Sequence, residues 1–437
     1  MYEILKTSFV AWILILLASQ SIAELEIEIT RGAGKRAPIA IVPFGWEGEN
    51  LNAPLDVAGV IGADLQRSGR FRPLPNEDML QKPNTGVEVD FDDWTILGIE
   101  AIIVGRVTQT GLNAYSIQFQ LFDVFRREQL IGYRMPASRG TIRRVAHRAA
   151  DMIFEKLTGI QGVFATKITY VTVEQNGSSR LFKLVVSDED GENETTIRES
   201  TDPIMSPAWS PDGRRLAYVS FEEDSEPAIF VQTLRTGNRI KVSSRRGVHN
   251  GAPAFSPDGR NLVLTLGSID GNLDIYVMNL SNREVKRLTT DRSIDTEGSW
   301  SPDGKQIYFT SDRSGGPQVY RIDSSGGVPE RITFEGSYNS RPRLSPDGKK
   351  LAIVHLDKGN YRIGVLDLNN GNFLILSTGN QDESPSFAPN SDKLIYATRQ
   401  GQNGVLETVS VDGLIRQRMG SGRVDVREPV WSPFPRL

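Results

Sequence analysis

The side chains that most often perform catalysis are scarce in this chain of 437 residues. It has no cysteine and three histidines, His147, His249 and His355, which lie far apart in the sequence. No serine occupies a Gly-x-Ser-x-Gly frame, which would present a nucleophile on a strand-to-helix turn, and no His-Glu-x-x-His motif is present. A histidine-rich metal site is therefore disfavoured, and we predict no catalytic, cofactor or metal site.

The three histidines sit in different sequence contexts. His355 ends an alternating strand pattern and fits a tolerated or hydrogen-bonded strand residue, while His147 falls in a helical pattern, where we expect it to be solvent-facing or structural. His249 differs, because the segment 248–253 leads into a strand from a Gly- and Pro-containing loop. Loops carry binding residues more often than the scaffold does, so a binding role is predicted for His249.

His249 and His355 lie within a repeat that occupies the second half of the chain. Ser-Pro-Asp-Gly occurs at 210–213, 256–259, 301–304 and 345–348, with weaker copies at 388–391 and 432–434. From Ser210 the steps are 46, 45, 44, 43 and 44 residues, which is the period of a four-stranded propeller blade. An apolar residue precedes each copy and an alternating strand follows it, so the sequence predicts a mainly β fold with a six-bladed β-propeller.

Each repeat reads as four strands. Proline stops one strand and Asp-Gly forms a turn; two further strands follow, and the segments 287–289 and 331–333 fit a fourth, outer strand. We call each copy of the Ser-Pro-Asp-Gly motif a station. The segment 168–172 resembles the second strand of a blade but has no station before it. The segment 429–433 resembles the first strand of a blade but has no further strand after it. We therefore predict that the C-terminus supplies the inner strand of the first blade, which would hide the open sheet edges.

The start of the chain has the features of a secretory signal peptide. Lys6, an apolar run over 9–18 and Ser21-Ile22-Ala23 form its three parts, with cleavage expected after Ala23. Ten apolar residues are too few for a membrane anchor, since a spanning helix needs about 20. Export and release are therefore expected, without direct membrane insertion.

An α/β domain is predicted between the signal peptide and the propeller. Residues 24–30 alternate between acidic and apolar side chains, as a half-buried strand does, and 31–36 form a basic link. Strands are expected at 39–44, 101–107, 115–125 and 128–135, and helices at 54–67, 91–97 and 141–157, with Gly159 ending the last helix. The predicted domains are thus 24–160 and 161–437, preceded by the signal peptide 1–23.

The loops before the six stations are expected to gather at one mouth of the propeller. They mix arginine with aspartate and glutamate, which supply donors and acceptors for a protein or peptide surface; the alternative is that they are solvated turns. The formal net charge of −4 is spread without long runs, which argues against nucleic-acid binding. The six loops are 203–206, 248–253, 294–298, 339–342, 381–384 and 425–428.

The order of these features resembles the TolB family, a periplasmic component of the Tol-Pal system of Gram-negative bacteria. The stretches that carry the resemblance are 154–160, 205–213, 249–259 and 276–278, and the likeness covers essentially the whole chain. It implies a non-enzymatic adaptor that supports outer-membrane integrity and envelope constriction during cell division, with other outer-membrane or periplasmic proteins as further partners.

The resemblance also implies two partner sites. One is for the lipoprotein Pal, where family contact positions match His249, Ala252, Thr296 and Glu297, and where Met205 and Arg341 occupy the corresponding loops. The other, for the C-terminal domain of TolA, aligns with Glu24, Leu25, Glu26, Ile27, Glu28, Ile29 and Thr30. The sequence departs from the family pattern after Thr30.

Two other interpretations stay open on the residues alone. On composition alone, residues 24–30 fit an ordinary first strand better than a partner-binding strand, because any half-buried strand alternates in this way. The mouth loops would also suit a propeller that binds a peptide or saccharide fragment of the cell wall. A peptidase-type propeller is disfavoured by the missing nucleophile.

Overall fold

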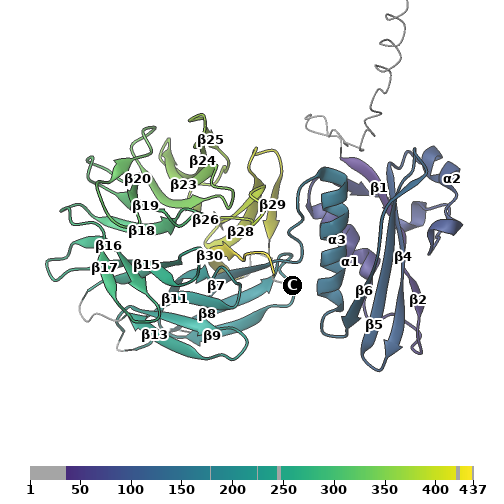
Figure 1. Ribbon diagram of the computed structural model, residues 1–437, viewed down its shortest axis with the longest axis horizontal. Coiled ribbons are helices and arrows are strands. Elements are labelled where there is room, and N and C mark those ends of the chain that lie inside the picture. The colour runs from purple at the N-terminus through teal and green to yellow at the C-terminus, as the bar shows by residue number, and fades with distance from the viewer. Residues whose placement is uncertain (1–35, 178, 224, 244–247, 420–423, 436–437) are drawn as a thin grey trace, which may run out of the picture.

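The computed structural model describes residues 36–435 apart from 178, 224, 244–247 and 420–423. The predicted signal peptide 1–23, the alternating segment 24–30 and the link up to residue 35 lie outside the described residues. Figure 1 shows an α/β domain, coloured purple to blue, beside a β-propeller that runs from teal to yellow.

A six-stranded sheet with helices on both faces forms the α/β domain. The strand order is β3-β1-β4-β5-β6, and β2 pairs with β4. The elements are β1 (Ala37–Ile41), β2 (Gly45–Glu47), α1 (Val57–Arg67), β3 (Phe71–Pro73), two short 3₁₀ helices (Asn76–Asp78 and Gly86–Glu88), α2 (Phe91–Ile96), β4 (Ala101–Gly111), β5 (Ala114–Asp123), β6 (Glu128–Ser138) and α3 (Ile142–Thr158).

The central strands of this sheet are buried on both faces, which explains their continuous apolar sequence. Ile39 and Ile103 point into a core shared with α1 and α3, whereas Ala40 and Ile102 point to the opposite side, where they pack with Trp94 of α2. Helix α1 begins at Val57, three residues after its predicted start at 54, because Asp56 caps it by accepting from the amide of Gly59 at 2.9 Å. Gly159 ends α3 at φ 72°, as predicted.

The propeller has six four-stranded sheets, as the repeat predicts. Blade 1 contains β30 (Asp425–Trp431), β7 (Lys167–Asn176), β8 (Ser179–Asp188) and β9 (Thr195–Ser200); blade 2 contains β10 (Ile204–Trp209), β11 (Arg215–Ser220), β12 (Ala228–Thr233) and β13 (Arg239–Ser243); blade 3 contains β14 (Asn250–Phe255), β15 (Asn261–Gly267), β16 (Leu273–Asn279) and β17 (Val285–Arg287). Blade 4 contains β18 (Asp295–Trp300), β19 (Gln306–Ser311), β20 (Gln318–Asp323) and β21 (Glu330–Arg331); blade 5 contains β22 (Asn339–Leu344), β23 (Lys350–Asp357), β24 (Asn360–Asp367) and β25 (Phe373–Ile375); blade 6 contains β26 (Glu383–Phe387), β27 (Lys393–Gln400), β28 (Asn403–Ser410) and β29 (Arg416–Met419).

Blade 1 is built from both ends of the propeller sequence, the arrangement that its two incomplete halves predict. Strand β30 pairs antiparallel with β7, with Val430 opposite Thr169 and Trp431 opposite Ile168. The indole of Trp431 donates to the Thr166 hydroxyl at 2.8 Å. The ring is thereby closed by backbone hydrogen bonds and not by side-chain packing alone.

The Ser-Pro-Asp-Gly stations form identical turns at the end of the inner strands. In the third blade, Asp258 accepts from the Ser256 hydroxyl at 2.5 Å and from the Arg260 amide at 3.0 Å, and Gly259 has φ 71°. The hydrogen bond from Ser256 lowers the pKa of Asp258. Each station therefore satisfies its own polar groups and needs no partner for its structure.

The apolar residues before the stations pack between neighbouring blades, as predicted. Trp209 donates to the carbonyl of Val430, and Trp300 to that of Ala254, so each indole reaches the inner strand of the preceding blade. The predicted outer strands are wrong by about two residues: β17 ends at Arg287 and β21 at Arg331. The chain then turns inward, because the Thr289 hydroxyl accepts from the amide of Ile275 at 3.0 Å.

The α/β domain contacts the propeller at the station end of blades 1 and 6. Arg70 lies 3.2 Å from Asp392, and the side chain of Asn390 donates to the carbonyl of Gln161 at 2.8 Å. Helices α1 and α3 lie on the side of the domain that faces the propeller (Figure 1). No helix within the described residues is long and apolar enough to cross a bilayer.

Candidate partner-binding mouth

One residue in each inner strand has a left-handed backbone, and the six together form a ring at the mouth of the propeller. Each lies at a register shift between the first and second strands of its blade, with φ between 45° and 60°. Such bulges re-aim side chains and are frequent beside binding sites. The six residues are Ser206, Ala252, Glu297, Arg341, Ser384 and Glu428.

The residue that follows each left-handed position is a sequence signal for these bulges. Proline follows the left-handed residue in five blades, at 207, 253, 342, 385 and 429, and Gly298 takes its place in blade 4. Proline cannot donate to the strand ladder, so its place three residues before each station predicts an interruption there. The six predicted mouth loops therefore overlap the beginnings of the inner strands, and the bulges give them their shape.

An ion pair between Glu297 and Arg341 links the mouths of blades 4 and 5. The Arg341 Nε lies 2.8 Å from Glu297 Oε1, and the Arg341 amide donates to Glu297 Oε2 at 3.0 Å. Burial would lower the pKa of Arg341, but the charges of Glu297, Glu428 and Glu383 outweigh it and raise that pKa. Both side chains are only partly exposed, so the pair is held in a fixed geometry.

A channel of about 470 Å³ runs between the inner strands of all six blades, and apolar as well as charged side chains line it. Arg343 lines it two residues beyond Arg341, and Glu428 lines it from blade 1 while accepting from the Ser206 amide. Burial raises the pKa of Glu428, although Arg341 opposes this, and burial lowers the pKa of Arg343. Arg343 was not among the predicted residues, because it follows the predicted loop 339–342 instead of lying within it.

The structure places the six residues predicted to contact Pal in different surroundings. Ala252, Glu297 and Arg341 line the channel entrance. Thr296 is partly exposed beside Glu297, and Met205 packs against the core between blades 2 and 3. The structure thus brings three of the six together at the channel.

His249 directly precedes β14, the inner strand of blade 3, and is exposed. Its imidazole covers the start of the inner strand, because a Cβ added at Gly251 would lie 2.4 Å from His249 Nε2. The Gly267 backbone is equally close, since a Cβ there would lie 2.8 Å from the His249 amide nitrogen. Two glycines therefore make room for this histidine at the mouth.

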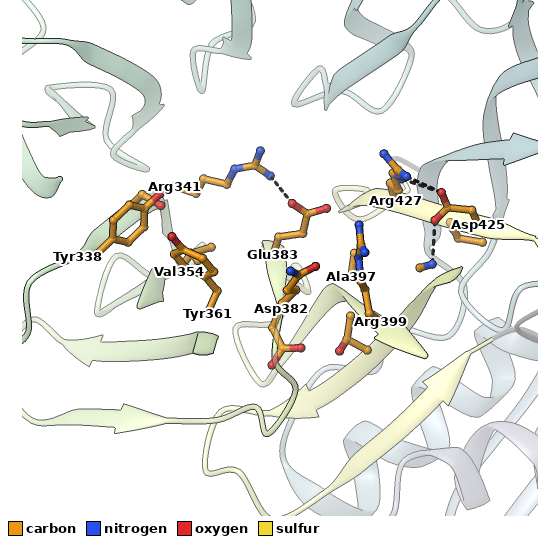
Figure 2. A pocket seen from close by; sticks show the side chains of 15 residues that line it. Tyr338, Arg341, Val354, Tyr361, Asp382, Glu383, Ala397, Arg399, Asp425 and Arg427 are labelled. Carbon is orange, nitrogen blue, oxygen red and sulfur yellow. Dashed lines mark hydrogen bonds and ion pairs between the residues drawn. The ribbon is translucent and has the colours of Figure 1, made fainter. Parts of the chain in front are cut away.

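A separate hollow of about 360 Å³ lies on the mouth side of blades 5, 6 and 1. Figure 2 shows Tyr338 and Tyr361 on one wall, Arg427 and Asp425 on the other, and Glu383 between them. The two tyrosine rings meet edge to face with centroids 5.2 Å apart. Aromatic faces beside acids and guanidinium groups suit a polar ligand with an apolar side.

The other two histidines serve the structure. His355 is buried and its Nδ1 lies 2.8 Å from Asn339 Oδ1, which confirms the prediction of a hydrogen-bonded strand residue. The solvent-facing alternative for His147 is wrong, since it is 1% exposed at the interface of the two domains. The sequence does not reveal this burial because the propeller turn that covers His147 comes more than 40 residues later in the chain.

One group of three acidic and histidine side chains within the described residues brings possible ligand atoms within 4.8 Å: Asp64, His147 and Asp190. Arg67 pairs with Asp64 at 2.6 Å, and Arg143 pairs with Asp190. Guanidinium groups already neutralise these carboxylates, so the arrangement is an ion-pair network. The predicted TolA-binding residues 24–30 lie outside the described residues.

A closed six-bladed propeller with an α/β domain on one face and a charged mouth on the other defines a class of two-domain propeller proteins. A family profile described as TolB amino-terminal domain matches residues 25–130, and one described as TolB beta propeller domain matches residues 154–435. The chain therefore belongs to the TolB family and is a propeller protein of the Tol-Pal system.

Individual relatives agree over the full length. Proteins named Tol-Pal system protein TolB from Nitrosococcus oceani and Thioalkalivibrio sulfidiphilus are both 48% identical to this chain, and the matches cover 96% and 94% of each chain, respectively. The crystal structure of TolB from Acinetobacter baumannii has a TM-score of 0.84 at 41% identity and covers 92% of this chain and 97% of that one.

Proposed function

We propose that this protein is a non-enzymatic periplasmic adaptor that binds Pal at the propeller mouth and the C-terminal domain of TolA through residues 24–30. In this role it supports outer-membrane integrity and envelope constriction during division. Membership of the TolB family supports the proposal, and so does the lack of a cysteine or a nucleophile motif.

The Glu297–Arg341 pair is the observation that carries the mouth site. Its two side chains are 23% and 31% exposed, so each keeps unused hydrogen-bonding capacity at a fixed position. A protein partner that covers the pair would meet preorganised groups and would spend little entropy on ordering them. An ion pair that a partner removes from water affects the binding free energy more than a mobile charge at the exposed rim of an interface.

Calorimetric titration of residues 24–437 with the soluble domain of Pal tests the mouth site. We expect binding that is weakened at least tenfold by Glu297→Gln and by His249→Ala. Glu284→Gln is the matched control, because Glu284 is an exposed glutamate at the station end of blade 3. Wild-type affinity in both mouth variants, each shown by cooperative thermal melting to be folded at the titration temperature, would contradict this site.

The TolA site is tested separately with the same preparation. We expect the C-terminal domain of TolA to bind residues 24–437 but not a chain that begins at Arg31. The shorter chain should still bind Pal, which shows that its propeller is folded. Equal TolA binding by both chains would place that site elsewhere.

The second candidate function is binding of a peptide or saccharide fragment of the cell wall. The hollow in Figure 2 favours it, because Tyr338 and Tyr361 offer a stacking face beside Asp382, Glu383 and Arg399. Titration with soluble peptidoglycan fragments distinguishes the two candidates: saturable binding that Tyr361→Ala abolishes, without any heat from Pal, would replace the adaptor proposal.

A further inference from the structure

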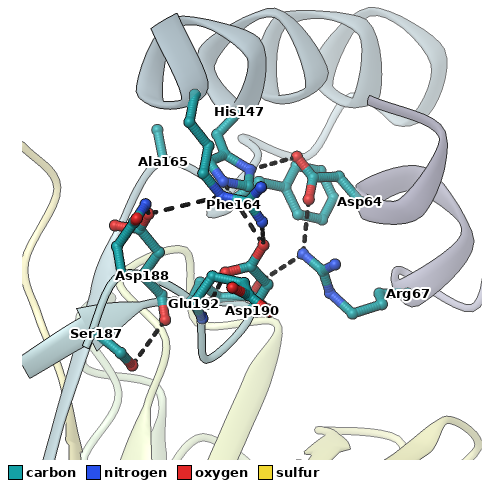
Figure 3. A network of polar contacts seen from close by, with 12 residues as sticks. Asp64, Arg67, His147, Phe164, Ala165, Ser187, Asp188, Asp190 and Glu192 are labelled. Atoms are coloured by element: carbon teal, nitrogen blue, oxygen red, sulfur yellow. Dashed lines mark hydrogen bonds and ion pairs between the residues drawn. The ribbon is translucent and has the colours of Figure 1, made fainter. Parts of the chain in front are cut away.

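His147 lies in the interface between the two domains and faces a carboxylate from each of them. Its Nδ1 is 2.7 Å from Asp64 Oδ2 on α1, and its Nε2 is 3.7 Å from Asp190 Oδ2 in the turn between β8 and β9. Figure 3 shows the ring between these two acids. The side chains of all three are at most 4% exposed, so water does not screen them effectively.

The groups around His147 come from α1, from α3 and from blade 1. Arg67 on α1 lies 2.6 Å from Asp64 and 3.2 Å from Glu189. Arg143 on α3 pairs with Asp190 and approaches Asp188 to 3.9 Å, and Lys167 of β7 holds Asp188 at 2.7 Å. Arg67 and Arg143 therefore also join the two domains, and acids and bases are nearly balanced.

The protonation state of His147 decides whether its contact with Asp190 is attractive. The short Nδ1 contact makes Nδ1–H the donor to Asp64. In the neutral ring, Nε2 then presents a lone pair to the Asp190 carboxylate, and Nε2 has no hydrogen-bond partner in the structure. In the imidazolium form, Nε2–H and the positive charge both face Asp190.

We propose that His147 is a proton-operated latch between the α/β domain and the propeller. When protonated it ties Asp64 of one domain to Asp190 of the other, and when it loses the proton the latch weakens and the domains separate more readily. Such a latch makes the relative position of the mouth-bearing propeller and the N-terminal domain depend on pH.

The electrostatic surroundings agree with this geometry. Burial by itself lowers the pKa of His147, but the hydrogen bond to Asp64 and the charges of Asp64 and Asp190 outweigh it, so that the pKa is raised. A histidine with a raised pKa in the docked state stabilises docking fully below about pH 6.5, its usual pKa. That stabilisation is lost as the pH rises through the pKa of the docked state.

The size of the effect follows from linkage. Each unit by which docking raises the pKa of His147 makes the docking constant about tenfold larger at the acidic limit than at the alkaline limit. Asp190 stabilises docking with the opposite pH dependence, because its pKa is lowered. That stabilisation is lost only in acid, below the pH range in which His147 titrates.

Domain separation can be followed with two fluorophores, because the chain has no native cysteine. Leu112→Cys on the α/β domain and Ile269→Cys on blade 3 provide attachment points that are 89% and 100% exposed. We expect energy transfer between them to change between pH 5.5 and pH 8.5 at constant ionic strength. His147→Gln, which retains a donor to Asp64 without titrating, should remove this change.

Further variants and conditions complete the test. Asp190→Asn should shift the transition to lower pH, and it reports on the latch even if His147→Gln fails to fold. His249→Gln, an exposed histidine at the far end of the inner strands, should keep the wild-type transition. A pH-independent wild type, or a transition retained in His147→Gln, would overturn the latch. A transition that EDTA abolishes and Zn²⁺ restores would overturn the latch, because it would mean that a metal ion, and not a proton, links His147 with Asp64 and Asp190.

Discussion

Arg341 Nε donates to Glu297 Oε1 at 2.8 Å, and this contact joins the left-handed residues of two neighbouring blades. The same glutamate accepts from the Arg341 amide at 3.0 Å and from the Thr310 hydroxyl at 3.1 Å. One side chain therefore supports two blades while it stands at the proposed partner surface. Charged groups at the mouth therefore also tie neighbouring blades together.

Replacing Glu297 by glutamine should lower the free energy of unfolding by about 1 to 2 kcal/mol, because a charge-assisted acceptor becomes a neutral one. Urea denaturation of Glu297→Gln and of the exposed control Glu284→Gln provides the measurement. A loss no larger than that of the control would mean that the pair adds little to stability.

The left-handed backbone of Ala252 predicts a stabilising substitution. Its φ is 45°, a conformation that costs a residue with a Cβ roughly 1 kcal/mol and glycine much less. Ala252→Gly should therefore leave the free energy of unfolding unchanged or raise it by up to about 1 kcal/mol. Ala254→Gly, two residues later in the same strand, should lower it by about 0.5 to 1 kcal/mol. Equal losses in both variants would contradict the assigned strain.

Closure of the ring by β30 predicts that the C-terminus stabilises the entire propeller. Trp431 is 4% exposed and packs with blade 6 through Ala388 and Ile395. Trp431→Ala should lower the free energy of unfolding by about 3 to 5 kcal/mol, and removal of residues 429–437 should lower the melting temperature further. Leu414→Ala, at a 63% exposed position, is the control. Normal melting of the truncated chain would show that β30 does not close the ring.

Asp151 predicts a specific dependence of stability on pH. It accepts from the amides of Phe164 and Ala165 in the segment that leads into the propeller, and burial raises its pKa from 3.8 to about 7. The folded state then binds the proton more tightly than the unfolded state between about pH 4 and pH 7. Stability should therefore fall as the pH rises through that range, by up to about 4 kcal/mol from this group.

Asp151→Asn is the test of this dependence, since it keeps an acceptor but does not titrate. Chemical denaturation at several pH values should give a flatter profile between pH 4 and pH 7 for Asp151→Asn than for the wild type. Superimposable profiles would assign the pH dependence to other groups, among them His147, whose raised pKa acts with the same sign.

Much of the fold was predictable because its signals are local and repeated. Pro257, Asp258 and Gly259 define a turn by their own chemistry, and a period near 44 residues leaves few architectures other than a propeller. The end of α3 was close for the same reason, since Gly159 is a local stop signal, whereas the start of α1 was predicted three residues early, because Pro54 suggests a first turn and Asp56 is the actual cap. Outer strands such as β17 were misplaced, because their ends depend on where Thr289 turns inward to Asp274 and Ile275.

The candidate site was only partly predictable. Glu297, Arg341 and Ala252 were placed near one another by the repeat alone, because equivalent positions of a propeller lie at the same end of the ring. Arg343 was missed, and Met205 proved to pack between blades, because which side of a bulged strand a residue faces depends on the register shift. The proline that follows the left-handed residue in five of the six blades is the signal that would have located these shifts.

The sequence by itself determined the repeat, the number of blades, the closing strand and the lack of a Gly-x-Ser-x-Gly or His-Glu-x-x-His motif, since each depends on residue types at short or regular spacing. The tertiary structure decided which charges meet: Glu297 with Arg341 across two blades, and His147 with Asp64 and Asp190 across two domains. Coulomb interactions and burial depend on distance in space and not along the chain. Partners that lie 43 to 83 residues apart therefore become visible only when the chain is folded.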